Sequence, residues 1–464
     1  MAMGKRKSQR QAALFVATDE LARSPGHPFY QKLNRLLAAA QFDTWLERRC
    51  QQYYETEEKR GKPSIPPGVY FRMLLVGFFE GIDSQRGIAW RCHDSRSLAE
   101  FLGYGPTDAT PDHSTLTNTR QRLPLEVCQE VFQFVLRLAD QHGLLRGRTV
   151  GVDSTTLEAN AAMKSIVRRD TGEDWQAYVT RLMREEGVID AEHEPTAEEV
   201  RRFDKARKNK RVSNDEWKSA TDEDARIAQL KDGRTHLAYK AEHVVDLETD
   251  LILAAEICPA NDGDAQTLVD SVLSAQANLQ AAESDAKIAE VVADKGYHSA
   301  ETIELATSLQ IRTYIPEPQR PHDRSWKDKP AGQQRAVNEN RRRMKRDKGK
   351  QLSRRRSEKV ERSFAHVCDT GGARRSWLRG EADVSKRYVI AAAGRNLSRI
   401  MRKLYGNGKP RGLQGLRALF CLVQLYIRWL MATLKRSTER CGHTSAFAMR
   451  SSESRRKSLI STGC

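Results

Sequence analysis

Two aspartates stand where carboxylates could carry out phosphoryl chemistry. Asp153 follows the apolar run 149–152 and Asp294 follows the run 290–293, and small or polar residues come after each acid. Carboxylates at the carboxyl ends of neighbouring strands converge at the crevice where α/β sheets bind their ligands. Hard oxygen ligands of this kind suit Mg²⁺ or Mn²⁺. We therefore expect Asp153 and Asp294 to hold divalent metal.

A third acid, Glu361, lies in a segment that predicts a helix over 353–367. Three apolar residues at helical spacing give this helix a face that can pack on a sheet: Val360, Phe364 and Val367. Glu358 lies three residues before Glu361 on nearly the same face and is the alternative third acid. With two metal ions about 3.5–4 Å apart, such acids activate a water or a 3′-hydroxyl for in-line phosphoryl displacement. No Ser-His or Cys-His set accompanies them, which favours metal-assisted chemistry.

The charge of the chain predicts a polyanionic partner. The 464 residues include 78 Lys and Arg against 61 Asp and Glu, a formal net charge of +17. Neutralising phosphates releases condensed counterions and drives binding. Within 341–362 twelve residues are basic and three are acidic. A block this basic is often a solvated face, but beside a predicted catalytic helix we expect it to follow a phosphate backbone.

Cysteine usage and hydropathy favour an intracellular protein over a secreted or membrane one. The eight cysteines are scattered without any CxxC pair, so neither a zinc ribbon nor a disulfide scaffold is expected. The N-terminus lacks a signal-peptide core. The most apolar segment, 412–434, is interrupted by Arg417 and Arg428, and we interpret it as a buried or partner-packing helix with no membrane span.

The coarse pattern of elements predicts a helical region followed by a mixed α/β region. Apolar spacing of three and four favours helices over 29–135, with a break at the prolines 63, 66 and 67. From residue 148 the expected order is three strands, helix, strand, helix, strand and a final helix. The corresponding segments are 148–159, 237–249, 251–260, 264–283, 290–294, 299–310, 312–317 and 353–367. Such an order indicates an α/β sheet with helices on its faces.

The predicted domain organisation follows from these shifts in composition. Two charged stretches are expected to interrupt the sheet region: 164–225, interpreted as largely helical, and 317–352, interpreted as a loop or arm outside the core. The expected segments are a flexible N-terminus (1–28), a helical DNA-binding domain (29–145), the catalytic domain (146–405), an apolar helix (406–436) and a polar tail (437–464).

Three short sequence motifs then connect the acids to a known family. VGVDSTTLEAN around Asp153, ADKGYHS around Asp294 and VERSFAHV around Glu361 closely resemble, in this order, the DDE transposases of bacterial insertion sequences. The likeness covers about 148–405, and STLTNTRQRL before it resembles the helical N-terminal region. It implies an RNase H-like core, with Asp153, Asp294 and Glu361 as the three metal-binding acids.

The resemblance also implies cofactors, partners and location. We expect Mg²⁺ or Mn²⁺, as two ions, and double-stranded DNA, both as transposon ends and as target. A homodimer on DNA is expected, for which 412–434 is a candidate interface, in a bacterial cytoplasm close to the nucleoid. Two other hypotheses stay open: a catalytically inactive DNA-binding regulator with this fold, and a stand-alone RNase H-like nuclease.

DNA contacts are predicted beside the acids and in the helical region. Related transposases often carry a Lys about two turns after the Glu, where this chain has Val367 and Cys368; Arg362, Arg374 or Arg375 are expected to replace it. The remaining predicted contacts are Arg120, Arg122, Lys295, Tyr297, His298, Arg354 and Arg355.

Several residues have a structural interpretation beside the functional one. Tyr297 is also interpreted as a packing residue. Asp246 is the runner-up carboxylate, although its surroundings favour a hairpin turn. A small local core is the expected use of the three tryptophans in the charged stretches, with base stacking as the alternative: Trp175, Trp217 and Trp326.

Overall fold

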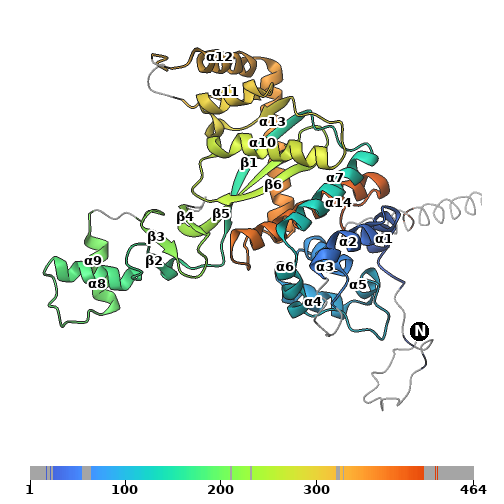
Figure 1. The fold of residues 1–464 in the computed structure, drawn as a ribbon, viewed down its shortest axis with the longest axis horizontal. Coiled ribbons are helices and arrows are strands. Elements are labelled where there is room, and N and C mark those ends of the chain that lie inside the picture. The colour runs from blue at the N-terminus through green and yellow to red at the C-terminus, as the bar shows by residue number, and fades with distance from the viewer. Residues whose placement is uncertain are drawn as a thin grey trace, which may run out of the picture. The chain divides into compact units, whose positions relative to one another are not determined.

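The chain begins with a group of helices. A computed structural model describes residues 25–54, 64–208, 212–229, 233–319, 324–327 and 329–411, and the isolated residues 17, 21, 424 and 426. In Figure 1 the helices from α1 to α7 precede every strand. Their bounds are α1 Pro28–Ala39, α2 Phe42–Cys50, α3 Pro67–Glu80, α4 Gln85–Asp94, α5 Arg96–Phe101, α6 His113–Arg122 and α7 Leu125–Gln141. Pro67 begins α3. Proline is tolerated at this position because the first residue of a helix donates no hydrogen bond within the helix.

A mixed sheet follows, in which five strands match the predicted ones and β4 was not predicted. Its strands are β1 Thr149–Glu158, β4 Arg226–Gln229, β5 Thr235–Asp246, β6 Ile252–Pro259, β7 Glu290–Val292 and β8 Arg312–Tyr314. The order across the sheet is β4-β5-β1-β7-β8, and β6 also pairs with β5. β5 is antiparallel to β1, whereas β7 is parallel to β1 and to β8. Asp246 accepts four hydrogen bonds at the β5–β6 turn and around residue 147, which is the structural use that its sequence context favoured.

Helices cover both faces of this sheet. Gly151 and Asp153 of β1 face α13 (Asp347–Phe364), because Val360 packs on Gly151 and Arg356 bonds Asp153. Ser154, the next residue along, faces α10 (Asp264–Ala281), where its hydroxyl donates to Asp264. Successive side chains of a strand point to opposite faces, so α10 and α13 lie on opposite sides of β1.

The first charged stretch folds into a small unit of its own. It contains β2 Ile166–Arg168, α8 Trp175–Glu185, α9 Ala197–Ala206 and β3 Trp217–Ser219, and β2 pairs with β3. Val179, Met183 and Val200 form a core against which Trp175 packs, and Trp217 is buried. The interpretation of 164–225 as largely helical therefore missed its two short strands, and the local core is the use made of both tryptophans.

The prediction of a loop or arm over 317–352 is wrong. The segment contains α12 (Ala331–Lys345) and the first turns of α13, which begins at Asp347. Both helices are rich in good helix formers. The buried face of α12 consists of Ala336, Val337 and Asn340, and the Asn340 amide bonds both the N–H and the carbonyl of Ile315. This face is too short and too polar to show as an apolar stripe in the sequence.

The long helix α14 (Glu381–Tyr405) joins the helical region to the sheet. It packs against α3, α7 and β6. Asn396 bonds the N–H and the carbonyl of Ile252 in β6, and the Tyr388 hydroxyl lies 2.9 Å from Nε2 of the buried His243. The domain boundaries drawn from the sequence stay predictions, and 412–434 lies outside the described residues apart from two isolated positions. Among the described residues no helix is long and apolar enough to cross a membrane.

Arg395 on α14 gives a first testable prediction. Its side chain is buried, and its three guanidinium nitrogens make no hydrogen bond within the described part of the chain. Burial and the neighbouring Arg399 lower the pKa of Arg395 to about 9. Replacing a poorly compensated buried charge by an apolar side chain of similar volume often stabilises a protein by about 1–4 kcal/mol. We expect Arg395→Met to raise the free energy of unfolding by this amount in urea denaturation.

The exposed Arg402 on the same helix supplies the control. Arg402→Met should leave the free energy of unfolding within about 0.5 kcal/mol of the parent, as surface changes usually do. A clear loss of stability in Arg395→Met would show that the guanidinium is compensated in the fold.

Candidate active site

Asp153 lies on β1 beneath helix α13. Its Oδ2 is 2.6 Å from a guanidinium nitrogen of Arg356, and its Oδ1 accepts from the N–H of Ser154. Asp153 was expected at a strand end, but β1 continues for five residues to Glu158, in agreement with the predicted bounds 148–159, because its pairing with β5 continues as far as Ala238. The carboxylate is therefore held by a rigid strand interior.

Asp294 follows the neighbouring parallel strand, β7. Gly151 and Val292 are the last paired residues of β1 and β7, and Asp153 and Asp294 each come two residues later. Asp294 begins the turn Lys295–Tyr297, where its Oδ1 accepts from the N–H of Gly296 at 2.7 Å. The structure thus places the two predicted acids at equivalent positions of adjacent parallel strands.

The charge of Asp294 acts on the ionisation of Asp153. Burial raises the pKa of Asp153, and the negative charge of Asp294 acts in the same direction, whereas Arg356 opposes both. The raised pKa means that one cation does not fully compensate the buried carboxylate. A further cation between the two carboxylates would relieve this repulsion.

A buried polar network supports the turn that contains Asp294. The side chain of Tyr297 is completely buried, and its hydroxyl donates to Glu242 of β5 at 2.8 Å. Burial raises the pKa of Glu242, which also accepts from Thr267 and Ser271 of α10. The prediction that Tyr297 contacts DNA is therefore corrected: it packs and anchors the turn. His298 is also buried, with 8% of its surface exposed.

Asp264, which sequence reasoning missed, belongs to this network. It lies in the first turn of α10, and its Oδ1 accepts from Ser154 at 3.0 Å and lies 3.1 Å from Nζ of Lys240. Its Oδ2 packs against Gly296. Asp264 therefore connects β1 to the Asp294 turn. In the sequence an acid at a helix start is an ordinary helix signal, so nothing there separates it from other acids.

The close approach at Gly296 gives a second prediction. A Cβ atom at this position would lie 2.9 Å from Oδ2 of Asp264 and 3.0 Å from Oδ1 of Asp294, so a methyl group must displace at least one of the two carboxylates. A displacement of about 1 Å at a reacting group can lower the rate about 10²-fold. We expect Gly296→Ala to lower DNA cleavage by about this factor, measured as a single-turnover rate.

Gly263→Ala is the matched control for this change. The nearest atom to a Cβ atom at Gly263 belongs to Gln266 and lies 3.6 Å away, an ordinary contact. Gly263→Ala should cleave within about threefold of the parent, a change of less than about 0.7 kcal/mol. Equal rates for the two variants would contradict the close packing around Gly296.

Glu361 and Glu358 lie about 60° apart around α13 and have different surroundings. Lys359 and Arg362 reach Asp250 at the β5–β6 turn, beyond the N-terminal end of β1. Glu358 is ion-paired with Arg362. At about 100° per residue, Glu361 lies on the flank of α13 opposite Lys359, away from the Asp250 side. It is exposed to solvent.

The donor set fits a divalent metal ion in part. The carboxylates of Asp153 and Asp294 are hard oxygen ligands of the kind that Mg²⁺ prefers. Within the described ranges, however, no three Asp, Glu, His or Cys side chains lie close enough together to hold a metal ion. Arg356 contacts Oδ2 of Asp153, so a metal ion bound through that oxygen would share it with the guanidinium or displace it.

The cationic residues predicted to contact DNA are divided between several places. Arg374 lies beside the acids, where it donates to the Thr155 hydroxyl at 3.2 Å, and Arg375 lies 3.8 Å from Glu158. Arg362 reaches Asp250 and is thus directed away from Asp153. Arg120 is 11% exposed and is paired with Asp383 of α14 at 3.0 Å. The other four are exposed: Arg122, Lys295, Arg354 and Arg355.

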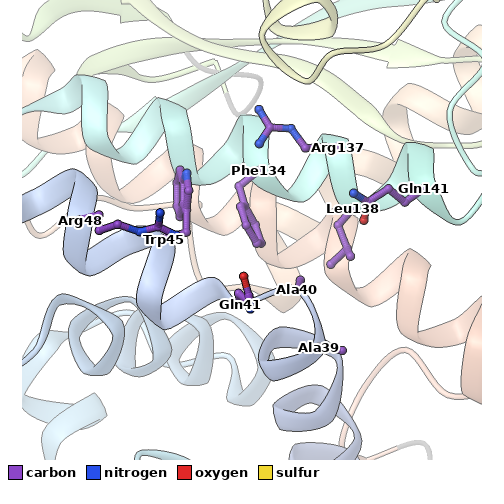
Figure 2. A pocket seen from close by; sticks show the side chains of 9 residues that line it. All are labelled: Ala39, Ala40, Gln41, Trp45, Arg48, Phe134, Arg137, Leu138 and Gln141. Carbon is purple, nitrogen blue, oxygen red and sulfur yellow. The ribbon is translucent and has the colours of Figure 1, made fainter.

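A hollow among the N-terminal helices is unrelated to the acids. It has a volume of about 340 Å³ and lies where Trp45 of α2 and Phe134 of α7 meet, with ring centroids 4.7 Å apart (Figure 2). Its lining contains no acidic side chain and no residue of the sheet. It therefore offers no metal ligand.

Comparison with known families agrees with the geometry. The family model described as transposase DDE domain matches residues 183–397, which include Asp294 and Glu361, while Asp153 precedes the match. The model described as transposase domain (DUF772) matches residues 18–122. Searches of curated proteins and of solved structures gave no match.

The two matches account for both regions of the fold. One covers most of the helical region, and the other covers most of the sheet region, whose mixed sheet flanked by helices is the RNase H-like fold of the DDE domain. The sequence motifs, the sheet order and the two family matches together show that the chain belongs to the DDE transposases of the insertion-sequence type.

Proposed function

We propose that this transposase binds the terminal inverted repeats of its element, cleaves the DNA strands there and joins the freed ends to target DNA. The observation that carries the proposal is the placement of Asp153 and Asp294 at equivalent positions of two adjacent parallel strands, with the Glu361 helix across them. This arrangement resembles the acid set that the family uses.

In this proposal Asp153, Asp294 and Glu361 hold Mg²⁺ or Mn²⁺, and Asp264 is a positioning residue. When bound, the metal stabilises the charge that develops on the attacking and leaving oxygens. Asp264 fixes the Asp294 turn against β1 through Ser154 and Gly296. The exposed arginines Arg354 and Arg355 on α13 bind phosphates of the end being cut. Two copies act together on paired ends.

A nicking assay tests the proposal. The purified protein is incubated with a supercoiled plasmid that carries both termini of the element, with Mg²⁺ or with EDTA, and the products are mapped by primer extension. We expect Mg²⁺-dependent nicks at the termini. Binding without cleavage would indicate an inactive regulator instead, and equal cleavage of a plasmid without termini would indicate a stand-alone nuclease.

A further inference from the structure

A basic groove lies at the far end of β1. Its volume is about 640 Å³. Glu158 and Asn160 line it at the end of β1, together with residues from 161–165, 234–237 and 375–379. Four cationic side chains line it against the single acid Glu158: Lys164, Arg234, Arg375 and Arg379. An excess of cations in a concave surface attracts a polyanion. We call it the distal groove.

The distal groove is connected to Asp153 along the edge of β1 that β7 leaves unpaired after Gly151. The pairing of β7 with β1 ends at Gly151, and beyond it the segment 374–376 runs along the same edge. There the N–H of Glu158 donates to the Arg374 carbonyl, and the N–H of Ser376 donates to the Glu158 carbonyl. Cations of this segment therefore follow the strand from the acids to the groove: Arg374 at Thr155, then Arg375 at Glu158.

Arg375 is held in place at the edge of the groove. Its guanidinium lies 4.8 Å from the ring centroid of Trp377, within cation–π range. The Trp377 indole donates to Asp83 at 2.8 Å, and its carbonyl accepts from the Asn160 amide in the groove wall. A cation with a fixed orientation loses little side-chain entropy on binding a phosphate, so this contact prepares the groove for one.

The length of β1 sets the distance between the groove and the cut. Five residues separate Asp153 from Glu158, and at about 3.4 Å per residue they span about 17 Å. Phosphates of one DNA strand are spaced about 3.4 Å along the helix axis, so this span corresponds to about five base pairs.

We propose that the distal groove binds the DNA backbone on one side of the scissile phosphate, about five base pairs away. The inference rests on the proposed function, since it takes Asp153 as the position of the cut. It assigns Lys164, Arg234 and Arg379, which no sequence feature singled out, to phosphate binding.

The salt dependence of DNA binding tests the proposal. Lys164 and Arg379 are exposed and make no ion pair within the described segments, so the double variant Lys164→Ala/Arg379→Ala should fold normally. Each lost phosphate contact lowers the slope of log K against log salt by about 0.9. We expect a slope shallower by about 1.8 on a labelled duplex carrying the element's terminus, and lost ethylation interference at phosphates about five base pairs from the cut.

A matched double variant provides the control. Lys287 precedes β7 and Arg312 begins β8, both exposed at the opposite end of the sheet. Arg312 lies 4.0 Å from Glu290 and is 65% exposed, and Lys287→Ala/Arg312→Ala removes the same charge. Its slope should stay within about 0.5 of the parent's slope, which is less than one phosphate contact. Equal slopes for the two double variants would overturn the groove proposal. A slope that changes only when an RNA duplex replaces the DNA duplex would overturn it as well. A parent protein that does not bind DNA would overturn the proposed function itself.

Discussion

Asp294→Ala is expected to abolish DNA strand cleavage, with a single-turnover rate at least about 10³-fold below the parent, whereas the affinity for the terminus stays within about threefold. The loss of transition-state charge stabilisation at a metal site amounts to several kcal/mol, and about 4 kcal/mol corresponds to 10³-fold. DNA affinity should persist because it depends on cationic side chains that contact phosphates, and Asp294 is an acid. Denaturing gels and fluorescence anisotropy measure the two quantities.

Asp270→Ala is the control for this variant. Asp270 is exposed on α10, the helix that begins beside the site at Asp264, and its removal should leave cleavage within about threefold. Cleavage by Asp294→Ala at the rate of the parent would refute the assignment of this acid. Loss of DNA binding together with cleavage would point to misfolding, and circular dichroism and the Tm of the variant separate that case.

Glu361→Gln is expected to lower the cleavage rate by about 10²- to 10³-fold, whereas Glu358→Gln should change it by less than about threefold. Removing one charged group that acts on the developing charge costs about 2.7–4 kcal/mol. Glu358 is 60% exposed and paired with Arg362, and such surface ion pairs contribute about 0–1 kcal/mol. The two glutamates are neighbours on one helix, so each variant is a control for the other.

The opposite ranking of the two variants would contradict the placement of Glu361. If Glu358→Gln lost cleavage and Glu361→Gln did not, α13 would have to rotate about its axis when DNA binds. Equal and small effects would show that the third acid lies elsewhere in the chain.

The sheet was predictable because its pattern is local. Thr149–Val152 and Glu290–Val292 are short runs dominated by β-branched residues, and the helix from Asp264 to Ala281 shows apolar spacing over five turns. Such elements depend on their own residues. The acids that follow these strands could be predicted as site residues because the sequence motifs around them resemble those of a known family.

What the sequence did not predict depends on contacts between distant residues. Tyr297 was expected at the DNA, but its hydroxyl bonds Glu242, which lies 55 residues earlier on β5. Asp264 joins the site only because α10 begins beside Ser154. The α12 helix is stabilised by Asn340, which bonds the backbone of Ile315. Neither composition nor periodicity records these pairings.

A titration of Mn²⁺ into the protein bound to terminus DNA, followed by electron paramagnetic resonance, tests the central claim most directly. It measures metal held by the acids without requiring any chemical step. We predict that the parent complex binds about two ions, that Asp153→Ala/Asp294→Ala binds none at the same concentration, and that Asp270→Ala binds as the parent does. Equal stoichiometry and affinity in the parent and in Asp153→Ala/Asp294→Ala would show that these carboxylates do not hold the metal.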